Sequence, residues 1–366
     1  MTRLASSLPT AGMIATRVVE LKRRRGLMIT LIAVDIGLPA LFLAIRLVLH
    51  VFAPRTSPPA GGDPIFAVMA AGFLPTFGFF TAVVVGCTAG SRDLAEGMFR
   101  HLVITGRSRL ALFLARIPAG LAIIVPLLAI SYAVVCAVSV FAKPAFVDDW
   151  DLNVPAGLTR TEFVNFAREH AEPVICALPY HGRLPQLASC AAAPQWSKST
   201  ILPAKAASPR LEELAVKIAD QDYRGYASMP LAPSVELMIK AGLWIELQAC
   251  VIFVIGLGLA SLMGQRTGPV VLLLAFQLIV TPVLAFVTLP HLQFLRRSVV
   301  GLALARLEPG GLPVAASLPG VTGGVGGPGS GSFRYAESGT EAVIVLVAWL
   351  AAWTMLGAWR MMTRDA

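Results

Sequence analysis

Hydrophobic positions along this chain gather into six long runs, and the polar stretches between the runs differ widely in length. Each run reaches about 20 residues, the length that an α-helix needs to cross the hydrocarbon core of a bilayer. The third run is longer than one crossing needs, so its ends stay open. The pattern predicts six transmembrane helices over these segments: Ile29–Phe52, Ile65–Ala89, Leu110–Ala142, Val235–Gly264, Pro269–Leu289 and Ala342–Met361.

The polar regions carry weaker signals. In residues 11–25, Ile14, Val18 and Leu21 share one face and basic residues occupy others, which favours an amphipathic helix in the headgroup plane over a disordered basic tail. Residues 143–234 contain little continuous apolar sequence and are expected to form a small outer subdomain with several short helices. The chain is expected to divide as follows: 1–26, cytoplasmic amphipathic segment; 27–142, helices one to three; 143–234, outer subdomain; 235–289, helices four and five; 290–341, outer segment; 342–366, helix six and cytoplasmic tail.

Within the outer regions, Ser208 followed by Pro209 is typical of a helix start. Thr161–Ala171 is a weaker helix candidate. After helix five, Leu295–Leu307 is interpreted as an amphipathic piece resting on the membrane. The tract from Gly310 to Ser332 is rich in Gly, Pro and Ser, so we expect a linker there.

Composition supports the membrane class. Hydrophobic residues make up 56% of the chain and charged residues only 14%, whereas a soluble domain carries roughly 25% charged residues. The formal net charge is +9, but the basic residues are not interleaved with stacking aromatics and many lie in short segments beside the apolar runs. We therefore expect contacts with anionic membrane lipids and no nucleic-acid partner.

Basic residues also orient the helices, because Lys and Arg are enriched in cytoplasmic loops. They precede helix one and separate helices two and three, which makes both segments cytoplasmic and places both termini inside. The arginines after helix five disagree with this orientation, and the signal from the first three helices outweighs them. The residues used are Arg17, Lys22, Arg23, Arg24, Arg25, Arg92, Arg100, Arg107, Arg109, Arg266, Arg360 and Arg364 inside, with Arg296, Arg297 and Arg306 discordant.

The cysteines fall into two groups. Cys176 and Cys190 lie in the outer subdomain, where an oxidising compartment makes a disulfide plausible, with two free thiols as the alternative. Cys87, Cys136 and Cys250 lie in apolar helices and are interpreted as small core residues.

No catalytic or metal-binding motif is present. The sequence lacks CxxC, HExxH and GxSxG, and Glu169–His170 has no partner at metal-ligand spacing. The stretch GGVGGPGSGS lacks the Lys and the following Ser or Thr of a Walker A motif and is interpreted as a linker. We therefore expect no enzyme activity, no catalytic residue, and no metal or cofactor bound by this chain.

Polar groups inside the predicted helices are candidates for lining a pathway. Asp35 lies in helix one, Glu246 in helix four and Gln277 in helix five, and Gln248 is also embedded. Intramembrane carboxyls are expensive and commonly face a bundle interior or a pathway. Hydrogen bonding between helices is the structural alternative, and both interpretations stay open. Arg46 lies eleven residues after Asp35, too far along the helix to pair with it.

Three segments together resemble a known family. VELKRRRGLMITLI enters helix one, RDLAEGMFRHLVITGRSRLALFLAR joins helices two and three, and GAWRMMTRDA ends the chain. The middle segment has Glu96–Gly97, a Leu-rich turn from Leu102 to Ile104, the TGRSR element and Arg116. The chain resembles an ABC-2 type transporter permease, the membrane subunit of an ATP-driven exporter. Its stretch between helices three and four is much longer than in simple members, which leaves any substrate analogy open.

The resemblance implies an all-α membrane protein with six transmembrane helices, an N-terminal amphipathic helix, a cytoplasmic coupling helix within 91–109 and an enlarged extracytoplasmic region. It implies a bacterial cell membrane location, pairing with a second permease copy, and two copies of a cytoplasmic ATPase subunit that hold ATP and Mg. The cargo classes are lipid, glycan, peptide and drug-like molecules. The residues expected to couple to the ATPase are Asp93, Glu96, Gly97, Phe99, Arg100, Leu102, Arg107 and Arg109.

Two other classes stay open. An ion-driven secondary transporter would use Asp35 and Glu246 as titrating groups, although we see no clear internal repeat of the kind common in that class. A non-transporting scaffold or sensor would use the outer subdomain as its working surface.

The orientation is testable by labelling. In a background without the five native cysteines, Ser108→Cys and Ser199→Cys are expected to react with a membrane-impermeant maleimide from opposite sides of sealed vesicles. Labelling of both positions from the same side would exclude this topology.

Overall fold

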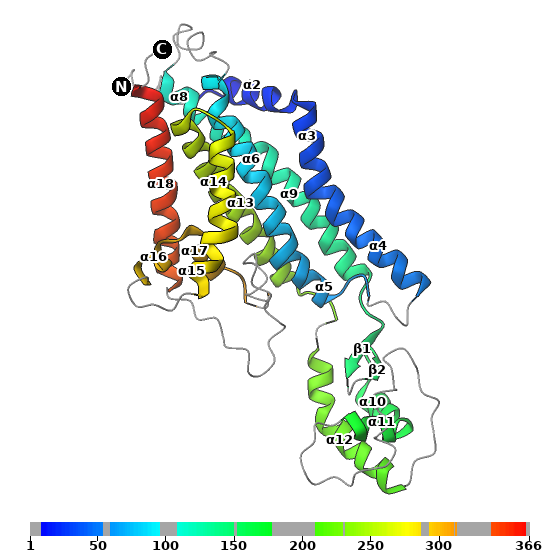
Figure 1. Ribbon diagram of the computed structural model, residues 1–366. Helices are drawn as coiled ribbons and strands as arrows, with labels where there is room; N and C mark the ends of the chain where they lie inside the picture. Colours follow the sequence, from blue (N-terminus) through cyan, green and yellow to red (C-terminus); the bar gives the residue numbers. More distant parts are fainter. Residues whose placement is uncertain are drawn as a thin grey trace. The chain divides into compact units, whose positions relative to one another are not determined.

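The computed structural model describes residues 9–53, 59–95, 108–149, 152–177, 209–229, 231–286, 293–310, 312 and 338–363 (Figure 1). Within them, six helical segments are long and apolar enough to cross a membrane, so the expected number and placement of the helices are confirmed. These spans are Arg25–Phe52, Asp63–Ser91, Arg109–Phe141, Val235–Met263, Thr267–Leu284 and Gly339–Thr363. The chain is therefore described as a multi-pass membrane protein.

The spans are built from the following elements. The first contains α3 (Arg25–Ile32), η1 (Ala33–Gly37) and α4 (Leu38–Phe52), and α2 (Ala11–Lys22) precedes it; the second contains α5 (Asp63–Val68), η2 (Met69–Phe73) and α6 (Leu74–Ala95); the third contains α8 (Arg109–Leu114) and α9 (Arg116–Phe141); the fourth is α13 (Val235–Met263); the fifth contains α14 (Thr267–Ala275), η4 (Phe276–Val280) and α15 (Thr281–Phe286); the sixth is α18 (Gly339–Thr363). The long third run is thus two helices, which meet at Ala115.

In the described part of the spans, three π-helical turns occur, and each ends two residues before a proline. A proline lacks an N–H, and its ring clashes with the carbonyl four residues earlier in a regular α-helix. In all three cases that carbonyl belongs to the π turn, so the wider turn relieves the clash. The pairs are η1 with Pro39, η2 with Pro75 and η4 with Pro282.

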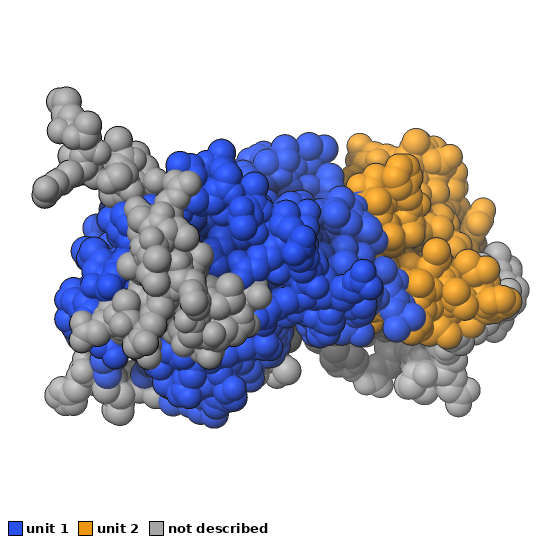
Figure 2. All heavy atoms as spheres, turned by 90° about the horizontal axis from the view of Figure 1, so that it is seen from above, with its two compact units in different colours: residues 1–41, 66–136, 234–366 blue, residues 42–65, 137–233 orange. Residues whose placement is uncertain are grey.

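The chain divides into two compact units, coloured separately in Figure 2. The first comprises residues 1–41, 66–136 and 234–366, and the second comprises residues 42–65 and 137–233. In the first unit, α13 is the central helix, because residues 251–261 are buried on every side. A helix that is apolar all round belongs in the interior of a bundle.

Two glycines let α6 approach α13 closely. A Cβ added to Gly86 would lie 2.5 Å from the Phe253 carbonyl oxygen, and one added to Gly90 would lie 2.4 Å from the Leu257 carbonyl oxygen. Their spacing, Gly-x-x-x-Gly, places both on one helix face, the pattern by which small residues bring membrane helices into backbone contact. We call this contact the α6–α13 seam.

The segment after the fifth span differs from its interpretation as an amphipathic surface piece. It forms α16 (Gln293–Ser298) and α17 (Val300–Arg306), and residues 300–305 of α17 are all buried. The indole N–H of Trp244 donates to the Leu304 carbonyl at 2.8 Å, and that of Trp349 donates to the Ser298 carbonyl at 2.8 Å. The small residues Gly301, Ala303 and Ala305 let α17 pack on every side, and Arg306 at its C-terminal end is its only charged residue.

The second unit contains a β-hairpin that an all-α prediction missed. Strands β1 (Phe146–Asp149) and β2 (Leu152–Pro155) pair antiparallel. Helices α10 (Arg160–Glu169), α11 (Ala171–Ala177) and α12 (Pro209–Ser228) share one hydrophobic cluster with Val154 of β2. The helix start predicted at Pro209 is confirmed, and α10 matches the weaker helix candidate. The hairpin escaped prediction because only short strands are involved and Val154 alone of β2 is buried.

One aromatic cluster organises this unit. Phe163 of α10 and Tyr226 of α12 stack with ring centroids 4.3 Å apart. The Tyr226 hydroxyl donates to the Pro155 carbonyl at 2.6 Å and accepts from the Leu158 N–H at 2.9 Å, which ties α12 to the end of the hairpin.

α10 begins with a capping box, in which Thr159 and Glu162 bond reciprocally. The Thr159 backbone N–H, and then its hydroxyl, hold the pKa of the Glu162 carboxyl below its usual range. The cap is therefore complete at neutral pH and weakens as the pH falls through that lowered pKa.

The seam predicts a contrast between two glycine substitutions. Gly90→Ala should destabilise the protein by about 1–3 kcal/mol, because its Cβ overpacks against a backbone oxygen that cannot move aside. Gly37→Ala is the matched control, since its Cβ would meet only the Ile32 carbonyl at 3.8 Å. Thermal unfolding in detergent measures both, and equal melting temperatures for the two variants would contradict the seam.

Candidate functional site

Asp35 lies in the η1 turn of the first span and is fully buried. The Thr81 hydroxyl of α6 donates to its Oδ2 at 2.5 Å. Its Oδ1 is buried and has no hydrogen-bond partner among the described residues. The carboxyl therefore faces protein and not acyl chains, and it fastens the first span to α6.

The π turn also exposes a backbone acceptor at the same residue. The Ser131 hydroxyl of α9 donates to the Asp35 carbonyl oxygen. This is the carbonyl four residues before Pro39, which has no N–H to offer it. One residue thus joins three spans, with its side chain on Thr81 and its backbone on Ser131. Sequence reasoning singled out Asp35 and missed both hydroxyl partners.

A second polar group lies between α6, α13 and η4. Gln248 and Gln277 are each 7% exposed, and both line a cavity of about 10 Å³ together with Pro75, Thr76, Phe79, Phe80 and Leu278. This volume is close to the lower limit for one water molecule. The Gln248 Oε1 is buried without a partner in the described part of the chain. Gln277 was a pathway candidate, and the structure brings it together with Gln248.

Glu246 stands apart from both groups. It is half-buried on α13, and its Oε2 is buried without a hydrogen-bond partner among the described residues. Arg46, a charged residue of the first span, donates to the Pro59 carbonyl at 3.0 Å. No described contact joins Glu246 to Asp35, so the two carboxyls form no pair.

Most of the expected coupling segment lies outside the described residues. This applies to Glu96, Gly97, Phe99, Arg100, Leu102 and Arg107, and to the side chain of Asp93, which belongs to α6. Arg109 is described and donates to the Met362 carbonyl at 3.1 Å. Just before it, the Ser108 hydroxyl caps α8 by accepting from the Ala111 N–H at 3.2 Å.

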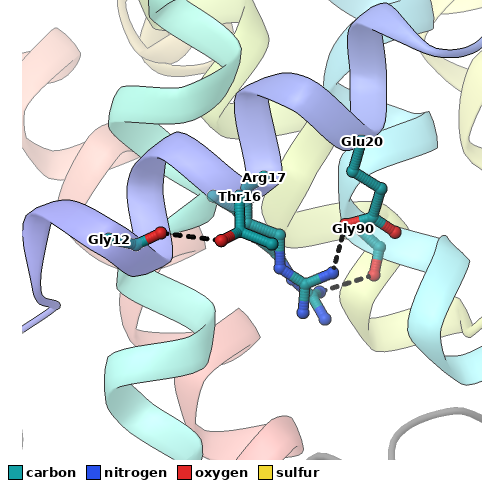
Figure 3. A network of polar contacts seen from close by, with 6 residues as sticks. Gly12, Thr16, Arg17, Glu20 and Gly90 are labelled. Atoms are coloured by element: carbon teal, nitrogen blue, oxygen red, sulfur yellow. Dashed lines mark hydrogen bonds and ion pairs between the residues drawn. The ribbon is translucent and has the colours of Figure 1, made fainter.

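A buried arginine joins α9 to α6, the helix that precedes this segment. Arg116, at the start of α9, is 3% exposed and donates to the Gly90 carbonyl at 3.1 Å. The Ser261 hydroxyl of α13 lies 3.3 Å from the same oxygen. On α2, Arg17 and Glu20 form an ion pair at 2.8 Å with both side chains largely buried. Figure 3 shows the Arg17–Glu20 pair and the Gly90 carbonyl, with Thr16 donating to the Gly12 carbonyl.

The cysteine predictions are tested only in part by the described residues. Cys87, Cys136 and Cys250 are free and buried or half-buried, as expected of core residues. Cys190 and the side chain of Cys176 lie outside the described residues, so their disulfide stays a prediction. Among the described residues, no three His, Cys, Asp or Glu side chains gather as a metal site.

Comparison with known proteins found no matching family model, no matching curated protein and no matching solved structure.

The Asp35–Thr81 contact predicts an energetic coupling. In a double-mutant cycle, Asp35→Leu and Thr81→Val are expected to be non-additive by about 0.6–1.7 kcal/mol, between the mean and the maximum measured for hydrogen bonds between membrane helices. Thr281→Val is the control partner, since its hydroxyl bonds within its own span to the Phe276 carbonyl at 3.2 Å. Unfolding in detergent gives all terms. Additivity of the first pair would show that the contact is absent.

Proposed function

We propose that this chain is the membrane subunit of an ABC-2 type exporter, which moves a lipid, glycan, peptide or drug-like cargo out of the cytoplasm or its inner leaflet. The observation that carries the proposal is the basic segment 91–109 between the second and third spans, which resembles the coupling segment of that family. The six apolar spans and the arginine-rich end support it.

The contacts around this segment support a mechanical role. On one side, Arg116 of α9 donates to the carbonyl of Gly90, which lies near the end of α6 and within the α6–α13 seam. On the other side, Arg109 holds α8 to the Met362 carbonyl at the end of α18. Phe113 of α8 is fully buried in a cluster with Ala358 and Met361. These contacts fasten the elements on both sides of the segment. A force on residues 96–107 would therefore be transmitted to α6, α9 and α18.

The proposed work cycle divides chemistry and movement between chains. ATP and Mg would be held by a cytoplasmic ATPase subunit, present in two copies, and two permease chains would pair in a bacterial cell membrane with both termini inside. ATPase closure would displace the coupling segment, and the spans anchored to it would shift together. In this scheme Asp35, Glu246 and Gln277 supply polar groups to the bundle interior.

An ion-coupled secondary transporter is the second candidate. It is favoured by one observation, the fully buried Asp35 with one carboxyl oxygen unpartnered among the described residues. Such a protein would transport in proteoliposomes with an ion gradient and no ATPase. The exporter would require the partner and ATP.

The coupling proposal is tested by the double variant Phe99→Ala with Leu102→Ala. These side chains are three residues apart, the spacing that would place them on one face of a coupling helix. Their loss should weaken complex formation with the proposed ATPase subunit, or leave its hydrolysis unresponsive to cargo. Co-purification and ATPase assays of the reconstituted complex measure both effects.

The matched control is Leu49→Ala with Phe52→Ala. This pair has the same spacing and is exposed, at 51% and 83%, at the far end of the first span. It should leave complex formation and hydrolysis unchanged. If the Phe99/Leu102 variant also keeps wild-type complex formation and cargo-stimulated hydrolysis, segment 91–109 is not the coupling element.

A further inference from the structure

A groove opens between α3 of the first span and α6 of the second. It has a volume of about 350 Å³, within the range of roughly 300–1,000 Å³ that is usual for small-molecule sites. Most of its lining is apolar, and the polar members come from three elements. The lining residues are Gly26, Leu27, Thr30, Leu31, Val34, Phe80, Thr81, Val84 and Arg266.

The hydroxyls of the groove already have acceptors. Thr30 donates to the Gly26 carbonyl at 2.9 Å, and Thr81 donates to Asp35. Each hydroxyl has a single hydrogen to donate. Arg266 is therefore the lining side chain that has donors to offer a ligand, and it brings five N–H groups in a planar fork that matches a phosphate.

Arg266 is a free cation at the mouth of this groove. It lies exposed between α13 and α14, and it makes no hydrogen bond or ion pair through its side chain with any residue in the described ranges. Gly26, at the start of the first span, lines the same groove. The charge therefore lies at a helix end, at headgroup level, while the apolar walls run inward along spans that cross the membrane.

We propose that this groove binds one anionic phospholipid, with its phosphate on Arg266 and an acyl chain along Leu27, Leu31 and Val34. A soluble anion would satisfy the arginine and leave the apolar walls unfilled, whereas a lipid satisfies both. The site is a property of this chain alone. It does not rest on the proposed transport function, and it holds for either orientation in the membrane.

Gly26 allows a side chain to be added at the lining of the groove. A Cβ added to Gly26 would meet nothing within 4 Å, so Gly26→Leu projects a side chain into open space without a clash. Gly12→Leu is the matched control, because Gly12 is also helical, also has open space around its Cβ position, and does not line the groove. For the charge, Arg266→Gln is matched by Arg360→Gln, an exposed arginine in the last turn of α18.

Native mass spectrometry of the full chain, delipidated and titrated with dioleoyl phosphatidylglycerol or dioleoyl phosphatidylcholine, tests the site. The wild-type protein is expected to retain one phosphatidylglycerol per chain in preference to phosphatidylcholine. Arg266→Gln should weaken phosphatidylglycerol binding about fivefold and remove the preference. Gly26→Leu should abolish binding of either lipid at this site, and both control variants should bind as the wild type does.

Three results would overturn the proposal. If Gly26→Leu and Arg266→Gln bind phosphatidylglycerol as tightly as their controls, the groove is not the site. If inorganic phosphate displaces the lipid at equal concentration, the groove recognises a soluble anion. If the variants leave lipid binding intact and shift the equilibrium between monomer and dimer, a second copy of this chain covers the groove.

Discussion

The close approach of α6 to α13 is the constraint on which the first unit depends. Because Gly86 and Gly90 have no side chains, the two backbones meet, and α13 is buried deeply enough to be apolar on every side. The seam also leaves the Gly90 carbonyl beside α9, where Arg116 donates to it. A buried arginine needs such an acceptor, since its charge has lost water. Helix packing and the position of the third span are therefore set by the same two residues.

The prolines show why the fold was only partly predictable. Hydropathy and length placed all six spans, since both depend on residues close in sequence. Pro39, Pro75 and Pro282 are visible in the sequence, but whether a helix bends or forms a π turn before a proline depends on which group bonds the freed carbonyl. The freed carbonyl of Asp35 accepts from the Ser131 hydroxyl, which lies 96 positions away in the sequence. Likewise the hairpin of the second unit depends on Tyr226, which no local pattern connects to Pro155.

The candidate site was likewise predictable only in part. The sequence singled out Asp35 and Gln277 because carboxyl and amide groups are rare inside apolar runs. The structure buries both residues. The hydroxyl partners of Asp35 and the cavity that Gln277 shares with Gln248 could not be named in advance, since Thr81, Ser131 and Gln248 come from other spans. Leu295–Leu307 was misjudged for a related reason. Its arginines suggested a surface, yet Gly301 and the alanines of α17 are small enough for burial on all sides.

α6 connects these features, because its successive faces serve different neighbours. Thr81 lines the groove beside α3 and donates to Asp35 of the first span, and Gly86 and Gly90 form the seam. The helix then leads into the segment proposed to meet the ATPase. A rigid helix transmits displacement along its length, so movement at its end would change the groove wall as well as the seam. A lipid bound at Arg266 would then be in contact with the element that the proposed motor moves. Its binding would favour whichever position of α6 leaves the groove open, because a ligand stabilises the conformation that it fits best.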